Sequence, residues 1–168
     1  MITRVVKRFI VLHLLFLSFS LCSAGQETGS GIKKNVIRLS AATMGIINGM
    51  ISADYERNIL VRDNIMLNIE ATYGKYYRTY TKESSQSLPA FHSFTSAFNT
   101  LIGGRSHHFE TSLGVRYSII TDDYYDGINP FYPVLNAGYR YQNPYGKGLI
   151  FRVFAGTTGI GMSVGKAF

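Results

Sequence analysis

Residues 65–73 read Ile-Met-Leu-Asn-Ile-Glu-Ala-Thr-Tyr, a stretch in which apolar and polar side chains alternate almost strictly. Successive side chains of a β-strand point to opposite faces, so one face of this segment carries Asn68, Glu70 and Thr72. The other face is apolar and consists of Ile65, Leu67, Ile69, Ala71 and Tyr73. The stretch therefore predicts a strand that separates a polar environment from an apolar one.

The same alternation recurs along the chain and predicts eight strands. They are expected at residues 35–44, 46–57, 65–73, 93–103, 107–118, 131–142, 148–156 and 160–168. The connections after the third and fifth strands are long, at residues 75–92 and 119–130, and the others are short. An even strand number with alternating short and long connections is typical of an antiparallel up-and-down β-barrel.

The first 24 residues have the organisation of a secretory signal peptide. Arg4, Lys7 and Arg8 form a basic start, an apolar run follows, and Cys22-Ser23-Ala24 is a small-residue cleavage site. The apolar run is too short for a membrane-spanning helix, which needs about 20 residues. We therefore expect a signal peptide at 1–24, a flexible lead-in at 25–34 and a barrel at 35–168.

Removal of this signal peptide would change the charge and cysteine content of the chain. The formal charge of +7 falls to +4, and no cysteine remains for a disulfide. The basic composition thus belongs in part to the targeting segment, and we expect no nucleic-acid partner.

Two kinds of barrel share this alternation, a soluble lipocalin-like carrier and a transmembrane barrel with its faces exchanged. Charged residues make up only 16% of the chain, which is low for a surface in water. Aromatic residues lie near strand ends on the apolar face, as in membrane-interface girdles. These residues are Tyr55, Tyr73, Phe109, Tyr117, Phe131, Tyr141 and Phe168. The pattern favours a transmembrane barrel over the soluble carrier.

Three short motifs resemble small bacterial outer-membrane β-barrel proteins. Gly159–Phe168 resembles their last strand, although Lys166 departs from the pattern. Gly138–Gln142, with Phe151–Val153 after a turn, is similar to the sixth and seventh strands of a poorly characterised eight-stranded group, and Asp54–Arg57 is similar to its second strand. The resemblance implies an outer-membrane location and recognition of Phe168 by the outer-membrane assembly machinery.

Several charged residues fall on the polar face of the predicted strands. An eight-stranded barrel is only wide enough to be filled by side chains, and an unpaired buried charge is costly. We therefore expect an ion-pair network that closes the lumen, with a proton or ion path as the alternative. The inward charges of the predicted polar lumen are Arg38, Glu56, Glu70, Glu110, Arg116, Arg140 and Arg152. Five of them fall in the half with the short turns and are expected to form the ion pairs, namely Arg38, Glu56, Glu110, Arg140 and Arg152.

The two long connections carry further charged residues. Lys75, Arg78 and Lys82 alternate with tyrosines, which indicates either contact with lipopolysaccharide phosphates or a solvated strand extension. Asp122–Gly127 places three carboxylates near a glycine, and its spacing favours a solvated turn over a calcium loop.

A lipid-modifying enzyme is the competing function. His92, Ser93 and Glu83 are its candidate residues, but adjacent strand residues point to opposite faces, so His92 and Ser93 are poor partners. His107 and His108 are adjacent as well and do not by themselves make a metal site. We expect no catalysis, cofactor or metal.

These patterns together predict an exported, monomeric barrel of the bacterial outer membrane with a polar, filled lumen. Its expected role is structural or surface-interacting, with outer-membrane lipids and lipopolysaccharide as partners. A lipid-modifying enzyme and a soluble lipocalin-like carrier remain the alternatives.

Overall fold

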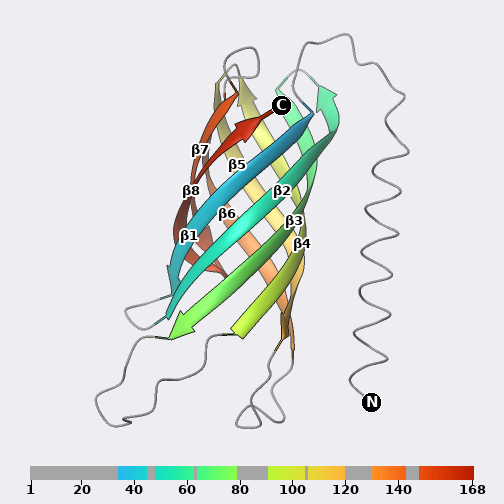
Figure 1. Cartoon of the computed structure of the whole chain (residues 1–168). Coiled ribbons are helices and arrows are strands. Elements are labelled where there is room, and N and C mark those ends of the chain that lie inside the picture. Colours follow the sequence, from blue (N-terminus) through green and yellow to red (C-terminus); the bar gives the residue numbers. More distant parts are fainter. Residues whose placement is uncertain are drawn as a thin grey trace, which may run out of the picture. The chain divides into compact units, whose positions relative to one another are not determined.

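In the computed structural model of the chain, eight antiparallel strands form one closed barrel (Figure 1). The strands are β1 (Asn35–Met44), β2 (Asn48–Arg62), β3 (Ile65–Arg78), β4 (Phe91–Gly104), β5 (His107–Ile119), β6 (Phe131–Gln142), β7 (Leu149–Gly156) and β8 (Gly159–Ala167). Each strand pairs with its neighbours in sequence, and β1 also pairs with β8, which closes the sheet. The prediction of an eight-stranded antiparallel up-and-down barrel is confirmed.

The structure describes residues 34–44, 48–62, 64–78, 91–104, 106–119, 130–142 and 148–168. The predicted signal peptide lies outside these ranges, as does the lead-in except for Lys34. Lys82, Glu83 and the acidic segment Asp122–Gly127 also lie outside them. Within the described ranges, no helix is long and apolar enough to cross a membrane.

β2 runs five residues further than the alternation predicts, because it contains a β-bulge. Asn58 lies opposite Asn68 and Leu60 lies opposite Leu67, so Ile59 has no counterpart on β3. An extra residue of this kind interrupts the side-chain alternation and bends the strand. Ile59 and Leu60 are both exposed, at 44% and 50%. Two consecutive outward side chains break the alternation, which is why the pattern predicts a strand that ends before them.

β3 is also longer than predicted, and it ends at Arg78 rather than Tyr73. The added part of the strand begins at Gly74, although glycine weakens a strand interior. In the structure Gly74 pairs with Ser52, and the ladder continues to the pair of Arg78 with Asn48. The connection between β3 and β4 is correspondingly shorter than the predicted 75–92.

The two ends of the barrel differ in their connections. We call the end that holds Asn35, Ala167 and the connections β2–β3, β4–β5 and β6–β7 the terminal end. The opposite end, where the connections β3–β4 and β5–β6 leave the barrel, is called the loop end.

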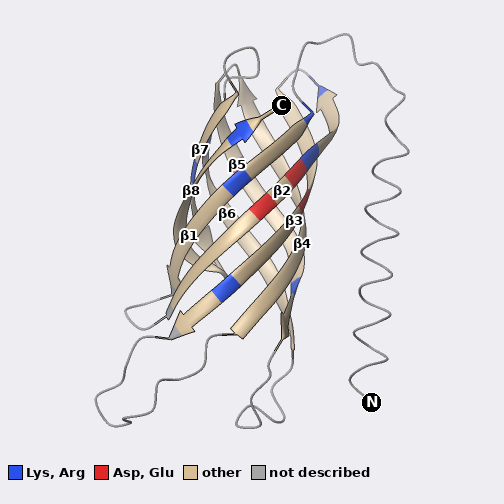
Figure 2. Ribbon diagram, in the orientation of Figure 1, with Lys and Arg blue, Asp and Glu red and all other residues tan. Residues whose placement is uncertain are grey.

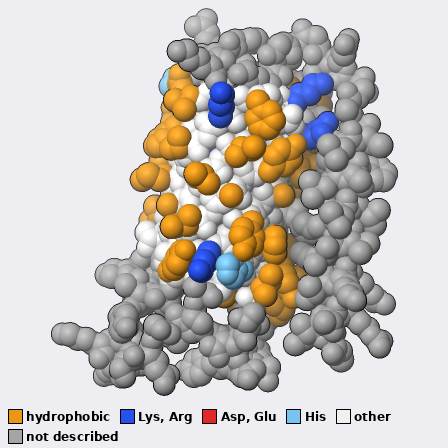
Figure 3. All heavy atoms as spheres, in the orientation of Figure 1, with side chains coloured by type: hydrophobic (Ala, Val, Ile, Leu, Met, Phe, Trp, Pro, Cys, Tyr) orange, Lys and Arg blue, Asp and Glu red, His pale blue; other side chains and the backbone are white. Residues whose placement is uncertain are grey.

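The barrel has an apolar outside and a polar inside. Leu39 and Ile160 are 68% and 69% exposed, whereas Arg38 and Glu56 are 1% and 0% exposed. Acidic positions are visible along β2 in Figure 2, but no acidic side chain shows on the same face in Figure 3, where hydrophobic side chains cover the wall. The carboxylates on this side of the barrel therefore point inward.

Two apolar clusters flank the polar interior. Val36, Ile150 and Ala167 form the cluster at the terminal end. Ala42, Met50, Tyr76 and Phe154 form the cluster at the loop end, and Phe91 packs against it. The buried charges lie between these clusters, so side chains fill the barrel along its length, as the width of eight strands requires.

Candidate functional site: the buried charge network

Glu56 on β2 is the centre of a polar network inside the barrel. Arg140 donates from Nη1 to Glu56 Oε2 at 2.9 Å and from Nη2 to Oε1 at 2.8 Å. Arg38 donates to Oε2 at 2.7 Å, and Asn68 and Asn99 each donate to the carboxylate at 3.0 Å. A carboxylate with this many charged and neutral donors is well compensated for its burial.

Glu70 on β3 extends the network from the other side of Arg38. The second terminal nitrogen of Arg38 donates to Glu70 Oε2 at 2.5 Å, and Asn99 donates to the same oxygen at 2.5 Å. Thr72 donates to the other oxygen at 3.0 Å. Arg38 therefore joins two carboxylates that come from neighbouring strands.

Glu110 on β5 connects two further arginines. Its Oε1 lies 3.1 Å from Nη2 of Arg152, and its Oε2 lies 3.8 Å from Nη1 of Arg140. Arg152 also donates to Ser112 at 3.0 Å and approaches Glu70 at 3.9 Å. The structure thus brings six of the seven predicted residues into one network.

Asp54 belongs to the network but is absent from the predicted set. It lies two residues from Glu56, so the alternation already places it on the inner face of β2. Its carboxylate approaches Nε of Arg38 at 3.8 Å, and it accepts hydrogen bonds from Ser40 and from Ser52, the latter at 3.1 Å. The signal that identifies Asp54 is therefore the same period-2 pattern that identifies Glu56.

Arg116 is the exception among the predicted residues. It is buried, but the described residues give it no ion pair, and its guanidinium lies 4.8 Å from the centre of the Tyr76 ring. Arg116 is six residues from Glu110 on β5, or about 20 Å along an extended strand. Arg116 therefore lies in the polar interior towards the loop end, where the described residues show no ion pair between it and the network.

Among the residues that the structure describes, the buried charges are balanced in number. The interior holds the carboxylates of Asp54, Glu56, Glu70 and Glu110 and the guanidinium groups of Arg38, Arg116, Arg140 and Arg152. Charges buried in equal numbers can neutralise one another, which removes much of the cost of taking them out of water.

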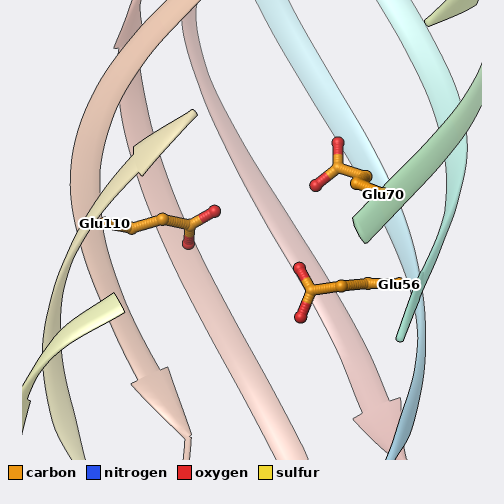
Figure 4. A group of neighbouring side chains, drawn as sticks. All are labelled: Glu56, Glu70 and Glu110. Atoms are coloured by element: carbon orange, nitrogen blue, oxygen red, sulfur yellow. The ribbon is translucent and has the colours of Figure 1, made fainter. Parts of the chain in front are cut away.

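Glu56, Glu70 and Glu110 point towards one another across the interior (Figure 4). Oxygen atoms of the three carboxylates lie within 4.8 Å of one another, a spacing that suits a hard cation. However, Arg38 and Arg140 already contact these oxygens. Since a metal ion would have to displace these guanidinium groups, we assign the three glutamates to ion pairs.

A small cavity lies between the network and the apolar cluster at the loop end. Its volume is about 30 Å³, and its lining includes Asp54, Glu70, Arg116, Arg152 and Phe154. Such a space holds a water molecule or two, because a single water needs only about 10–15 Å³ on this measure and several polar partners. The cavity is far too small for an organic ligand, which needs several hundred Å³.

One glycine makes room for the network. Gly165 on β8 is the pairing partner of Arg38 on β1. A Cβ atom at Gly165 would lie 2.4 Å from Cγ of Arg38 and 2.2 Å from the carbonyl oxygen of Ile37. Glycine at this position therefore lets the Arg38 side chain cross the interior.

His92 and Ser93, the two described residues of the enzyme alternative, do not form a catalytic pair. Ser93 is buried inside the barrel, whereas His92 lies on the outer face and its Nδ1 is 2.6 Å from the hydroxyl of Tyr73. The two side chains point to opposite faces of β4, as predicted. Glu83, the candidate acid, lies outside the described residues.

The remaining predicted residues lie at the two ends of the barrel. His107 is at the terminal end with its Nδ1 2.6 Å from the Tyr139 hydroxyl, and its neighbour His108 points inward and is buried. Lys75 lies on the outer face near the loop end, 5.4 Å from the centre of the Tyr77 ring. For Arg78 the structure describes only the backbone, as the last residue of β3.

Phe168 extends the pairing that closes the barrel. Its amide donates to the carbonyl of Asn35 at 2.8 Å, and its carbonyl accepts from the Asn35 amide at 3.2 Å. The Phe168 side chain is exposed on the outside of the barrel.

The fold and the network were compared with known proteins at three levels. No family model, no curated protein and no solved structure matches this chain. The geometry of the barrel itself is therefore the basis for its proposed function.

Proposed function

We propose that this protein is a transmembrane β-barrel of the bacterial outer membrane with a structural or surface-interacting role and no catalytic activity. One observation carries the proposal, the sorting of charge between the two faces. All the acidic residues that the structure describes are buried in the interior, and large apolar side chains cover the outer wall. In water this arrangement would expose the apolar wall and bury the charges, both at a cost.

A lipid environment removes the cost of exposing the apolar wall. Transmembrane barrels carry an apolar band outside and alternate it with polar residues inside, which is the arrangement of β3, β5 and β8 here. The outward-facing charged side chains of the described strands are Arg57, Arg62, Lys75 and Lys166. All four are basic and lie towards the barrel ends, where anionic lipid headgroups would meet them.

The filled interior favours a closed barrel over a diffusion pore. The network of Arg38, Glu56 and Arg140 is fully buried, and the apolar clusters flank it at both ends. A lipocalin-like carrier is disfavoured, because its interior would have to hold an apolar ligand where this barrel holds ion pairs.

Membrane fractionation and gel mobility test the proposal together. We expect the protein to remain in the outer-membrane fraction after a carbonate wash and to migrate differently on gels before and after boiling. Vesicles that contain the folded protein should remain impermeable to small ions. Release by the wash without any mobility shift would contradict the membrane location, and steady ion leakage would contradict the closed interior.

A further inference from the structure

Lys75 and His92 face each other on the outside of the barrel near its loop end. They are direct pairing partners on β3 and β4. Exposed aromatic side chains surround them, namely Tyr73, Tyr77 and Phe94. Figure 3 shows a basic side chain beside a histidine at the lower edge of the hydrophobic wall.

Both side chains are held in place by aromatic neighbours. The hydroxyl of Tyr73 lies 2.6 Å from Nδ1 of His92, and the two rings stack at 5.6 Å with an interplanar angle of 16°. Nζ of Lys75 lies 5.4 Å from the Tyr77 ring centre, within range of a cation–π contact. When Tyr73 donates to Nδ1, the neutral imidazole carries its proton on Nε2, which is then a donor on the outer surface.

No carboxylate of the described residues accompanies this pair on the outer face, since all of them are buried inside. Direct cross-strand neighbours have Cβ atoms about 4.5–5.5 Å apart, so Lys75 and His92 are close enough to contact one anion together. An ammonium group beside an N–H donor suits a phosphate oxygen. The position at the edge of an apolar wall suits an anion that is attached to an acyl chain.

We propose that Lys75 and His92 bind a phosphate group of a lipid A-type glycolipid, with Tyr73 as the positioning residue for the imidazole. The inference rests on the proposed function. Outer-membrane barrels have short periplasmic turns and longer extracellular loops, so the loop end, which carries the long connections, would meet the lipopolysaccharide leaflet. Phe94 and Phe98 continue the outer face of β4 from His92 into the apolar wall and are 40% and 47% exposed. The acyl chains of the bound lipid lie against these rings.

The test measures lipid retention by the folded full-length protein in neutral detergent. Bisphosphorylated lipid A and the same lipid without phosphates serve as the two probes, and native mass spectrometry counts the bound lipid. We expect the phosphorylated form to be retained about tenfold more strongly, a difference of about 1.4 kcal/mol. Phosphatidylglycerol is the third probe and should be retained less well than lipid A.

Three variants locate the site. Lys75→Met keeps the length of the stem, and His92→Phe keeps the ring, so each should lower retention of phosphorylated lipid A several-fold without loss of folding. Lys166→Met is the matched control, because Lys166 is an exposed cation on the outer face at the terminal end. Its retention of lipid A should equal that of the unchanged protein.

A double variant tests the positioning role of Tyr73. If Tyr73 acts through the imidazole, Tyr73→Phe lowers retention in the unchanged protein but has no further effect in the presence of His92→Phe. Additive losses would contradict that role.

Other outcomes would overturn the phosphate site itself. Equal retention of the two lipid A forms, equal losses in Lys75→Met and Lys166→Met, or stronger retention of phosphatidylglycerol would each do so. Every sample is first checked for its mobility shift on boiling. A protein without that shift contradicts the proposed function, whereas a shifting barrel that ignores phosphate contradicts only this site.

Discussion

The middle of the barrel interior and its loop end hold buried arginines in different ways. In the middle, Arg140 donates two hydrogen bonds to one carboxylate, and Glu56 accepts from a second arginine as well. At the loop end, Arg116 lies over the ring of Tyr76 beside a small cavity. Charge-assisted bidentate hydrogen bonds are stronger than a cation–π contact, so the middle should be the more tightly held region.

The two regions also differ in how many strands their contacts join. The network in the middle draws residues from β1 to β7, so the loss of one member affects several strands at once. The contact of Arg116 with Tyr76 joins only β5 and β3. We therefore expect large effects from the network and small ones from the loop end.

Replacement of Arg140 should have the largest effect. Arg140→Leu leaves the buried carboxylate of Glu56 with one arginine and removes the longer contact to Glu110. The free energy of unfolding should fall by about 3–5 kcal/mol, the usual cost of a broken buried ion pair. A urea titration of the protein in lipid vesicles measures this loss.

Arg116→Leu is the control for that comparison. It removes a buried guanidinium of the same size from the same interior, and its cost should be clearly smaller. Equal losses of unfolding free energy in the two variants would show that the middle and the loop end hold their arginines equally tightly.

The eight strands and their faces could be predicted because alternation is a local property of the sequence. The ion pairs themselves could not be predicted, since they depend on the register of strands far apart in the chain. Arg140 and Glu56, for instance, are 84 positions apart. Arg116 shows the limit clearly, because the alternation predicts its inward direction but not whether a carboxylate pairs with it.

The pairing of Lys75 with His92 on the outer face could not be predicted from the sequence either. Each residue could be noted separately in the sequence, one as a basic residue in a tyrosine-rich segment and the other as a candidate base. Their direct pairing follows from the register of β3 with β4 and from the continuation of β3 past Gly74. Glycine weakens strands, so the sequence alone does not indicate that continuation.

A charge on the outer wall tests the contrast between the two faces. Leu39 lies near the middle of β1 and is 68% exposed, next to the fully buried Arg38. In a lipid bilayer, Leu39→Arg should cost about 2–4 kcal/mol, the cost of an arginine on the lipid face near the bilayer midplane. Urea titration in vesicles measures the change, and an unaltered free energy of unfolding would indicate that this wall does not face lipid.

A side-chain atom added next to Arg38 should lower the free energy of unfolding by a smaller amount. Gly165→Ala places a Cβ atom 2.4 Å from Cγ of Arg38, so the arginine or its strand must move. A loss of about 1–3 kcal/mol is expected for such overpacking. Gly49→Ala is the matched control, because a Cβ atom there would meet nothing within 4 Å. A loss at Gly49 as large as that at Gly165 would mean that the tight fit around Arg38 is not the cause.

The smallest effect is expected at the loop end, where a double-mutant cycle can isolate the contact of Arg116 with Tyr76. Tyr76→Leu and Arg116→Leu should be coupled by about 0.5–2 kcal/mol, the range of a cation–π contact in a partly desolvated site. Four urea titrations in vesicles give the coupling. A value near zero would mean that the ring is not what compensates the buried guanidinium. The small cavity beside Arg116 would then be the place to look for a compensating water molecule.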